Sequence, residues 1–486
     1  MLTVILILFP LALSLILLAI RQEKAIRQFA LAGSLIEFGV AVAAFIQYKT
    51  SCHCNLLFSA DWLATLGVSL RFGMDGISLL MVMLTTFLVP VIILSSFNHA
   101  YERPSAFYSL ILLMEMALVG VFVAFDGLIF YIFWELALIP AYFICAVWGG
   151  NDRIRITFKF FIFTFVGSLF MLVALIYLYF RTPFPHSFDF QSLYSATLTP
   201  VEQAWIFAAF FLAFAIKIPI FPLHTWQPDT YTVAPAAGSM LLAGIMLKMG
   251  IYGMIRWMIP ICHQAVQQFA PVVIILSITG IIYASVIAIR QSDMKRLVAY
   301  SSIAHVGLIA AGVFALTPWA MEGAVIQMVS HGINIVGLFI VIDLIEQRTG
   351  SRTIGELGGI ALKAPRLAAV FMIILLGSIA LPLTNGFTGE FLLLLGLFEY
   401  SKIFAAIAGV TIIFSAVYML WMYQRTMLGK TSEATEKISD LSLAETVIFI
   451  PLVIMIFWIG IYPKLFLNIA EPFVRSIIEI SNITHK

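Results

Sequence analysis

Residues 213–222 read Ala-Phe-Ala-Ile-Lys-Ile-Pro-Ile-Phe-Pro, so the ammonium group of Lys217 lies inside an apolar run that two prolines interrupt. A second lysine, Lys248, lies in the run Leu-Leu-Ala-Gly-Ile-Met-Leu-Lys-Met-Gly of residues 241–250. A lysine at the middle of a bilayer costs roughly 2.5–3.5 kcal/mol on insertion scales, so one that is kept there usually faces a partner or a water path. These two stretches therefore predict membrane helices with functional buried charges.

The rest of the chain is also strongly apolar. Of its 486 residues, 62% are hydrophobic and only 11% are charged. Soluble domains have about 25% charged residues, so this composition predicts a polytopic protein of the lipid bilayer. The net charge of +2 gives no indication of nucleic acid binding. Residues 1–20 have no basic residue ahead of their apolar run, which indicates a first membrane helix rather than a cleaved signal peptide.

Fourteen apolar runs are long enough to cross a bilayer, which takes about 20 residues each. We therefore expect an all-α polytopic membrane protein of about fourteen transmembrane helices. The runs lie near residues 2–20, 29–48, 76–97, 106–124, 127–148, 157–180, 204–226, 233–258, 268–289, 298–316, 321–346, 367–398, 403–424 and 442–467.

Two of these runs are interrupted in corresponding places. The seventh contains Pro219 and Pro222, and the twelfth contains Pro382 followed by Asn385-Gly386. Paired interrupted helices of this kind indicate an inverted repeat and its ion site. We therefore predict two inverted five-helix repeats, each with a broken helix. The expected division is an N-terminal part of three helices, a first repeat, a second repeat, and a C-terminal helix with a tail, at residues 1–105, 106–258, 268–430 and 440–486.

Basic residues predict the orientation of the helices. The odd-numbered connections hold 17 Lys and Arg residues, whereas the even-numbered connections and the termini hold 8. Cytoplasmic loops of membrane proteins carry the excess of Lys and Arg. The sequence therefore predicts that the odd connections are cytoplasmic and that both termini lie on the outer side.

Glu135 follows the apolar run Leu-Ile-Phe-Tyr-Ile-Phe-Trp of residues 128–134 and is the first candidate partner for these lysines. If the separation of a glutamate and a lysine varies, the lysine alternately holds and releases its proton. The alternative is a static ion pair that fixes helix packing. Because charges inside the membrane are usually functional, we favour a proton path through Glu135, Lys217 and Lys248.

Three residues extend this path into the second half of the chain. His305 and His331 lie in neighbouring runs, and Glu390 follows the second break in the sequence Leu-Pro-Leu-Thr-Asn-Gly-Phe-Thr-Gly-Glu. Histidine can relay protons near neutral pH, although a lone histidine on an apolar helix is more often a packing residue. The sequence also places Glu115 as a candidate second carboxylate beside Glu135, and Glu37 as a polar packing residue.

The sequence predicts no cofactor or metal bound by this chain. Cys52-His53-Cys54 places three ligands side by side but has no second cluster, which makes a poor metal site. No glycine-rich nucleotide-binding loop is present.

Several motifs give the chain a family resemblance. The longest is Pro-Leu-His-Thr-Trp-Gln-Pro-Asp at residues 222–229, followed by Ala-Pro-Ala-Ala-Gly-Ser-Met-Leu-Leu-Ala-Gly-Ile-Met-Leu-Lys-Met-Gly at residues 234–250. The others are Phe-Gly-Met-Asp-Gly-Ile-Ser at 72–78, Phe-Trp-Glu at 133–135, Lys-Arg-Leu-Val-Ala-Tyr-Ser-Ser-Ile-Ala-His at 295–305, and Gly-Glu-Phe at 389–391. From about residue 70 onward, the chain resembles the subunit M branch of the antiporter-like membrane subunits of NADH:quinone oxidoreductase, respiratory complex I.

The resemblance implies fourteen helices, two inverted repeats and one proton channel. It implies an ion pair of Glu135 with Lys217, a central Lys248 and a terminal acid at Glu390, and His305 and His331 match family histidines. The sister subunits L and N have lysine at the last position, so the glutamate favours M. So do the stretch Leu-Ala-Gly-Ile-Met-Leu-Lys at 242–248 and the absence of the long C-terminal lateral helix of subunit L.

The family also implies a setting. Subunits L and N are the expected neighbours, and quinone, FMN and iron–sulfur clusters are expected in partner subunits. The expected location is the inner membrane of a bacterium. The chain departs from the family pattern Trp-Leu-Pro-Asp-Ala-His followed by a glutamate, because Gln227, Thr230-Tyr231 and Val233 occupy those places, which implies a different arrangement of proton uptake there.

Two other functions remain as alternatives. One is a subunit of a multi-subunit sodium/proton antiporter of the Mrp type, which shares these motifs. The other is a helix bundle without transport activity. Glu390 and the stretch around Lys248 favour the complex I subunit over the Mrp type, and the buried charges argue against a scaffold.

Overall fold

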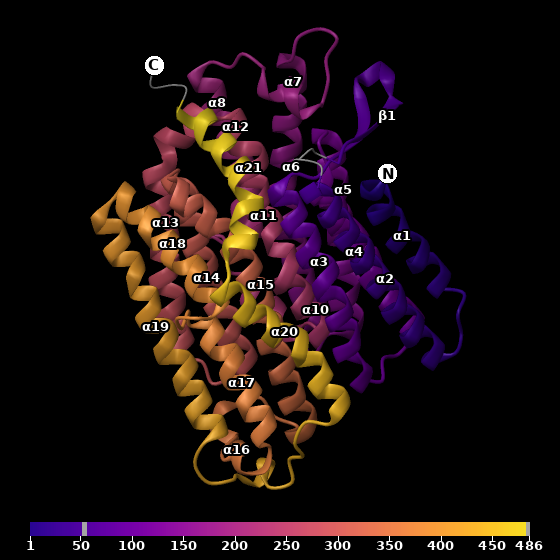
Figure 1. Ribbon diagram of the computed structural model, residues 1–486, viewed down its shortest axis with the longest axis vertical. Helices are drawn as coiled ribbons and strands as arrows, with labels where there is room; N and C mark the ends of the chain where they lie inside the picture. Colours follow the sequence, from indigo (N-terminus) through magenta and orange to yellow (C-terminus); the bar gives the residue numbers. More distant parts are fainter. Residues whose placement is uncertain (51–55, 483–486) are drawn as a thin grey trace. The chain divides into compact units, whose positions relative to one another are not determined.

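The computed structural model describes residues 1–50 and 56–482 and is built almost entirely from helices (Figure 1). Its internal contacts divide the chain into two compact units. Unit 1 contains residues 1–218, 245–270 and 469–486, and unit 2 contains residues 219–244 and 271–468. These two units do not coincide with the two repeats predicted at residues 106–258 and 268–430, and the boundaries of the repeats stay a prediction.

The all-α membrane fold predicted from the sequence is confirmed. Within the described residues, twelve helices are long and apolar enough to cross a membrane, and Leu2–Leu17 and Pro365–Ser378 are shorter apolar helices. Each of the fourteen predicted runs overlaps one of these helices. The agreement arises because the thickness of the bilayer fixes the length of an apolar run that can span it.

Most helices of unit 1 begin at side chains or prolines that suit a helix start. Asp75, Asp126 and Thr199 accept hydrogen bonds from backbone N–H groups of the first turn, which otherwise have no partner. The helices of this unit are α1 (Leu2–Leu17), α2 (Glu23–Thr50), α3 (Gly76–Ser95), α4 (Pro104–Val123), α5 (Gly127–Trp148), α6 (Arg153–Arg181), α7 (Phe190–Tyr194), α8 (Pro200–Lys217), α11 (Leu247–Gly253) and α12 (Ile259–Ile261).

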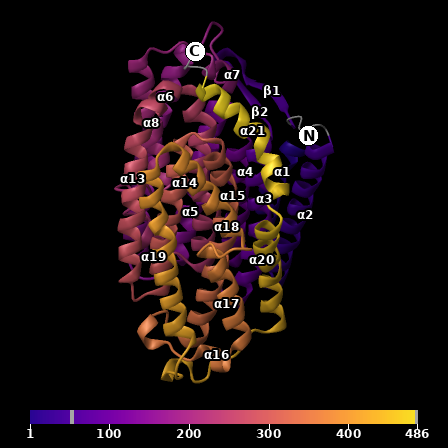
Figure 2. The same ribbon diagram turned by 60° about the vertical axis from the view of Figure 1, so that its left-hand side comes forward.

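One end of unit 1 has a structure that the sequence analysis did not anticipate. Strands β1 (Phe58–Leu63) and β2 (Val68–Phe72) form an antiparallel hairpin, which lies beside α7 at this end of the unit (Figures 1 and 2). The hairpin is bonded to the connection between α4 and α5, because Phe125 N–H donates to the Arg71 carbonyl oxygen at 2.9 Å. The same connection is bonded to the segment before α7, because Gly127 N–H donates to the Phe188 carbonyl oxygen at 2.8 Å. The second, fourth and sixth connections therefore meet at this hairpin end of unit 1.

The first, third and fifth connections meet at the opposite end. Arg27 donates to the carbonyl oxygens of Phe97 and His99, both at 2.7 Å, and the Trp148 indole donates to the carbonyl oxygen of Glu102 at 2.7 Å. This alternation of odd and even connections is the one that a bundle of antiparallel membrane helices requires.

Unit 2 has the same predominance of long helices. Asp293, Thr317 and Ser401 accept hydrogen bonds at three of the helix starts. Its main helices are α9 (Gln227–Val233), α10 (Ala236–Leu241), α14 (Met294–Ala315), α15 (Pro318–Thr349), α16 (Ile360–Lys363), α17 (Pro365–Ser378), α18 (Asn385–Tyr400), α19 (Lys402–Met427) and α20 (Leu443–Ile461). Helix α13 (His263–Ile289) continues from unit 1 into unit 2.

Both predicted breaks are present. In the seventh run the helix ends at Lys217, and helical structure resumes only at Gln227. In the twelfth run α17 ends at Ser378 and α18 begins at Asn385, with Ala380 and Leu383 in the left-handed region at φ 57° and 72°. Left-handed backbone is unfavourable for residues other than glycine, so the surrounding packing must hold this break in place.

The span Ala236–Ile261 is continuous but irregular. Leu242–Met246 and Met254–Met258 are π-helical turns on either side of α11. Each π turn rotates the side chains that follow it, and such turns occur frequently at functional sites. Lys248 is the second residue of α11, which follows the first turn, and Arg256 lies within the second turn.

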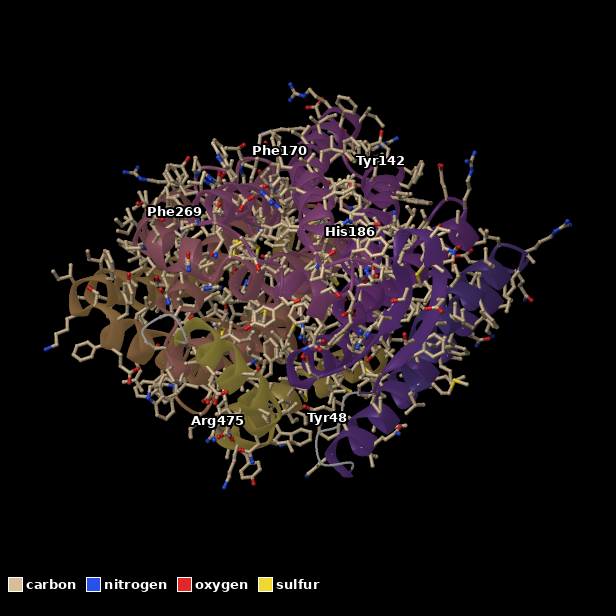
Figure 3. All side chains as sticks on the ribbon, turned by 90° about the horizontal axis from the view of Figure 1, so that it is seen from above. Tyr48, Tyr142, Phe170, His186, Phe269 and Arg475 are labelled. Atoms are coloured by element: carbon tan, nitrogen blue, oxygen red, sulfur yellow. The ribbon has the colours of Figure 1, made fainter. Side chains whose placement is uncertain are left out.

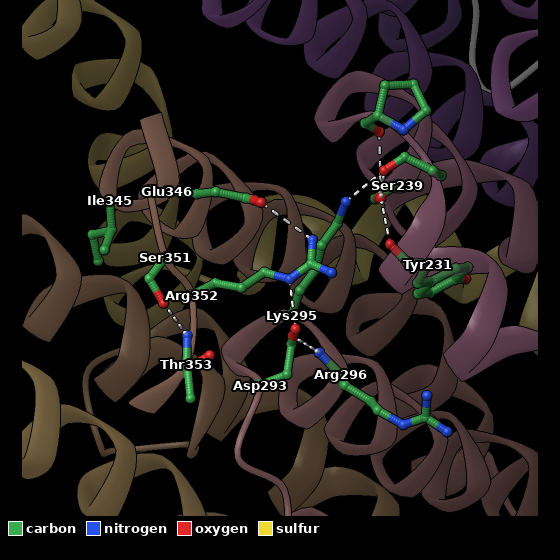
Figure 4. Close-up of polar contacts among 12 residues, drawn as sticks. Tyr231, Ser239, Asp293, Lys295, Arg296, Ile345, Glu346, Ser351, Arg352 and Thr353 are labelled. Atoms are coloured by element: carbon green, nitrogen blue, oxygen red, sulfur yellow. Dashed lines mark hydrogen bonds and ion pairs between the residues drawn. The ribbon is translucent and has the colours of Figure 1, made fainter. Parts of the chain in front are cut away.

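A polar network joins the seventh, ninth and eleventh connections of unit 2 (Figure 4). The buried ammonium group of Lys295 donates to the carbonyl oxygen of Ala234 at 2.5 Å. Arg352 contacts Asp293 at 2.5 Å and Glu346 at 3.4 Å, and the Asp293 carboxylate also caps α14. Basic residues at this end thus have carbonyl and carboxylate partners from separate connections.

The C-terminal residues that were expected to form a tail are helical. Helix α21 (Lys464–Asn482) buries Ile469, Phe473 and Ile477 along one side. On its other side Arg475 pairs with Glu471 at 2.5 Å and points outward (Figure 3). A helix with one apolar side packs on a surface instead of crossing the membrane, which explains why the search for membrane-spanning runs missed it.

We expect Asp126 to stabilise unit 1, because its fully buried carboxylate accepts bonds from Leu128, Ile129 and Ser69 N–H groups at 3.0, 3.1 and 3.3 Å. Asp126→Ala should lower the free energy of unfolding by about 0.5–2 kcal/mol, the usual loss for a removed cap. Asp126→Asn keeps an acceptor and should lose less. Thermal unfolding in detergent measures both, and equal losses would contradict the capping role.

Burial also raises the pKa of Asp126 to about 6. An acid with a higher pKa in the folded state than in the unfolded state binds its proton more tightly when folded. Its contribution to stability is therefore present at low pH and is lost as the pH rises from the ordinary value of 3.8 through about 6. The Asn variant should lack this part of the pH dependence in the same unfolding measurement.

Candidate functional site

The first group of buried charges lies in unit 1, where α5, α6 and α8 pack together. Lys217 is the last residue of α8 and is 2% exposed, and its Nζ lies 5.3 Å from the centre of the Trp134 ring. Glu135 follows Trp134 on α5, is half-buried, and is close enough to Lys217 for their charges to interact. The structure therefore places an ammonium group, an aromatic face and a carboxylate near one another.

Helix α6 supports this group from the side. The Ser168 hydroxyl donates to the Phe165 carbonyl oxygen of the same helix at 2.8 Å and lies near the Glu135 carboxylate. A Cβ atom at the preceding Gly167 would lie 2.7 Å from Ile216 and 3.4 Å from the Ala213 Cα atom. The missing side chain thus lets α6 approach the last turn of α8, which brings Ser168 to the carboxylate that faces Lys217.

Lys248 lies in α11 of the same unit and is completely buried. Two residues later, a Cβ atom at Gly250 would lie 2.9 Å from the carbonyl oxygen of Phe214 and 2.5 Å from Ile218. Helix α11 therefore passes directly against the end of α8, where Lys217 lies. The residues expected to form the first half of the path are brought together within unit 1.

The second group lies in unit 2 and has Glu390 at its centre. His305 Nδ1 on α14 and Glu390 Oε1 on α18 are 2.8 Å apart, and both side chains are almost fully buried. The Gln327 amide on α15 donates to the same oxygen at 3.4 Å, and the His331 ring centre lies 6.2 Å from that of His305. All three predicted residues of this half are thus close together.

A small polar cavity adjoins these residues. Its volume is about 10 Å³, close to the space for one water molecule. It is lined by Ser301, His305, Gln327, His331, Asn334, Ile335 and Ser378. Ser378 ends α17 at the second break, so the break contributes directly to this polar site.

Close helix contacts hold the second group in position. A Cβ atom at Gly389 would lie 2.2 Å from the Gln327 side chain, and one at Gly377 would lie 3.0 Å from the side chain of Asn334. Ser330 Oγ donates to Asn385 C=O at 3.0 Å, and the Asn385 side chain donates to Ser330 C=O at 3.3 Å. These bonds fix the start of α18 against α15 and thereby orient Glu390.

Sequence reasoning missed Gln327 and Asn334. With His331 they form a polar stripe at spacings of four and three residues on the apolar helix α15. Residues at these spacings share one face of a helix. Such a stripe was a usable signal, but uncharged amides are less conspicuous than lysines and glutamates in an apolar run.

The placement of Glu115 beside Glu135 stays a prediction. The structure adds Glu37, on α2, whose carboxyl group lies close enough to that of Glu115, on α4, for the two to interact. Both carboxyl groups are completely buried, and none of their oxygens has a hydrogen-bond partner among the described residues.

The described residues contain no group of three or more His, Cys, Asp or Glu side chains that could hold a metal ion. Cys145 and Cys262 are buried and form no disulfide bond. The candidate metal fragment Cys52-His53-Cys54 lies outside the described residues.

Comparisons with known proteins agree on fold and family. The family model described as "NADH:quinone oxidoreductase/Mrp antiporter, TM" matches residues 124–415. NADH-quinone oxidoreductase subunit M of Rickettsia conorii is 40% identical over 473 residues, 95% of each chain. A chain in the solved structure of respiratory complex I from Thermus thermophilus with bound NADH matches with a TM-score of 0.92 at 31% identity and covers 99% of both chains.

A chain of the Mrp complex from Dietzia sp. has a TM-score of 0.82 at 20% identity, covering 99% of this chain and 52% of that chain, and shows the fold alone. The fold and the buried charges define an antiporter-like membrane protein of the class that complex I and Mrp assemblies share. Within that class, the chain belongs to the NADH-quinone oxidoreductase subunit M family. It is thus a multi-pass membrane subunit of a proton-translocating NADH:quinone oxidoreductase.

We expect the bond between His305 and Glu390 to be necessary for proton transfer in unit 2. Glu390→Gln keeps the size of the side chain but removes the carboxyl proton, so it should abolish most pumping, whereas Glu390→Asp should retain part of it. Proton pumping in vesicles, normalised to assembled complex, measures both variants. Pumping at the wild-type level in Glu390→Gln would remove this residue from the path.

Proposed function

We propose that this chain conducts protons through two groups of buried charges, Glu135–Lys217–Lys248 in unit 1 and His305–His331–Glu390 in unit 2. The observation that supports this most directly is the position of Lys217. Its ammonium group is buried at the broken end of a membrane helix, beside the Trp134 ring and close enough to the Glu135 carboxylate for the two charges to interact. A lysine held in this way can lose and regain its proton when the carboxylate moves or is protonated.

The roles of the residues follow from their surroundings. Glu135 controls the charge on Lys217, Lys217 passes its proton to Lys248, and Glu390 with the histidines is the terminal acceptor. The chain supplies the proton path, while electron transfer from NADH to quinone takes place in partner subunits that hold FMN, iron–sulfur clusters and the quinone. The sister antiporter-like subunits L and N are the proposed neighbours in the membrane.

The setting proposed for the chain is the inner membrane of a bacterium with both termini outside. The odd connections hold most of the basic residues, which predicts that they are cytoplasmic. In unit 1 the first, third and fifth connections meet at one end, which supports the same assignment. Protons would then be taken up from the cytoplasmic end of unit 1.

We expect Lys217→Ala and Glu135→Ala each to remove most proton pumping and, through coupling, to slow quinone reduction. Each variant removes one member of a charge pair that is costly in the membrane unless it is used. Pumping and NADH:quinone reduction are measured on the same vesicles. The matched control is Lys363→Ala, which removes an exposed lysine of α16 and should pump normally.

Complex assembly separates this function from a packing role. If the two alanine variants fail to assemble, the charges serve mainly to hold the helices together. If both assemble and pump like the wild type, the proposed path through unit 1 is wrong.

A further inference from the structure

A cavity opens into unit 1 at its hairpin end. Its volume is about 250 Å³, enough for several water molecules. It reaches the surface at Arg71, whose side chain is 36% exposed, and at the exposed Ser476 of α21. It extends inward to Asp75 and Arg256, whose side chains are only 13% and 4% exposed.

Arg256 is held rigidly at the inner end of this hairpin-end cavity. It forms an ion pair with Asp75 and donates to Ser78 Oγ and to the Tyr252 hydroxyl, both at 3.2 Å. Its guanidinium carbon also lies 4.6 Å from the ring centre of Phe473 and 4.9 Å from that of Phe125. Ionic, hydrogen-bonding and cation–π contacts together fix the position of this charge.

A polar face connects Arg256 with Lys248. Lys248 and Tyr252 are four residues apart on α11 and so share a face, and Arg256, in the π-helical turn that follows, donates to the Tyr252 hydroxyl at 3.2 Å. The Tyr252 hydroxyl is fully buried, donates to the carbonyl oxygen of Phe122 at 2.8 Å and lies 3.0 Å from Ser78 Oγ. The proposed pumping path uses Lys248 but neither of the other two residues.

This polar face would be either a second proton path or a barrier against one. A guanidinium group is not deprotonated in proteins, so Arg256 cannot accept a proton and pass it on. A fixed guanidinium charge at the inner end of a cavity that water can enter repels hydronium, as arginine does in pores that exclude protons. The chemistry of arginine therefore favours the barrier.

We propose that Arg256, positioned by Asp75 and Tyr252, is an electrostatic barrier that keeps protons in the hairpin-end cavity from reaching Lys248. This inference rests on the proposed function, because it concerns the same lysine. If Lys248 could exchange protons with both ends of unit 1, the unit would be a leak that dissipates the proton gradient. With Arg256 in place, Lys248 exchanges protons with the other end only.

The test is the passive proton conductance of the purified whole complex in liposomes, measured under an imposed membrane potential and without NADH. The variant R256M/D75N removes both charges. Its asparagine amide can still cap α3, as the Asp75 carboxylate does by accepting from Ser78 N–H at 3.1 Å. We expect the conductance to rise severalfold in this variant and to stay at the wild-type level in Arg256→Lys, which keeps the charge.

Arg71→Met is the matched control, because it removes a guanidinium group from the mouth of the same cavity. Its conductance should stay at the wild-type level. If the assembled R256M/D75N complex is no leakier than the wild type, or if Arg71→Met is equally leaky, the barrier is ruled out. Arg256→Gln, which is neutral but keeps hydrogen-bond donors, provides the same comparison if the double variant does not assemble.

The conductance is measured without turnover, so its outcome is separate from that of the pumping experiment. Normal pumping in the Lys217→Ala complex would overturn the proposed function. A proton leak in the R256M/D75N complex would still show that Arg256 blocks proton entry from the hairpin-end cavity, because that measurement does not depend on pumping.

Discussion

Taking a charged group out of water is expensive, and this cost determines how the helices of both units pack. A charge in the hydrocarbon region is tolerated when other parts of the protein replace the lost water. Lys217 is covered by Trp134, whereas Glu390 is bonded by His305. These contacts come from neighbouring helices, so the charges require close helix approach, which glycines at the contact points permit.

The replacement of water is incomplete at the sites proposed to conduct protons. One oxygen of Glu135 and one of Glu390 have no hydrogen-bond partner among the described residues. Arg256, by contrast, has an ion pair, two hydrogen bonds and aromatic contacts. A fully paired charge is fixed, whereas a partly paired group changes its protonation when its neighbours shift slightly. The same physical cost thus distinguishes groups that conduct from a group that blocks.

Much of the fold could be predicted because the bilayer imposes a length on each helix and proline marks the breaks. The β1–β2 hairpin and α21 could not be predicted in this way, because the bilayer imposes no length on elements that do not cross it. The charged residues of the site were recognisable by their cost in apolar runs. Gln327 was not recognised, because an uncharged amide stands out less. The proximity of Glu37 to Glu115 was missed because sequence gives the depth of a residue but not which helices adjoin.

The first break favours a lysine at the end of the interrupted helix in unit 1. Lys217 ends α8, where the free carbonyl groups carry partial negative charge, whereas Glu390 lies in the second turn of α18, beyond the reach of the helix end, and is bonded by His305. Such interactions contribute about 0.3–1 kcal/mol, which offsets only part of the roughly 2.5–3.5 kcal/mol cost of a charge in mid-membrane. The remainder has to come from side chains such as Glu135 and His305, and their movement then controls whether each charge is present.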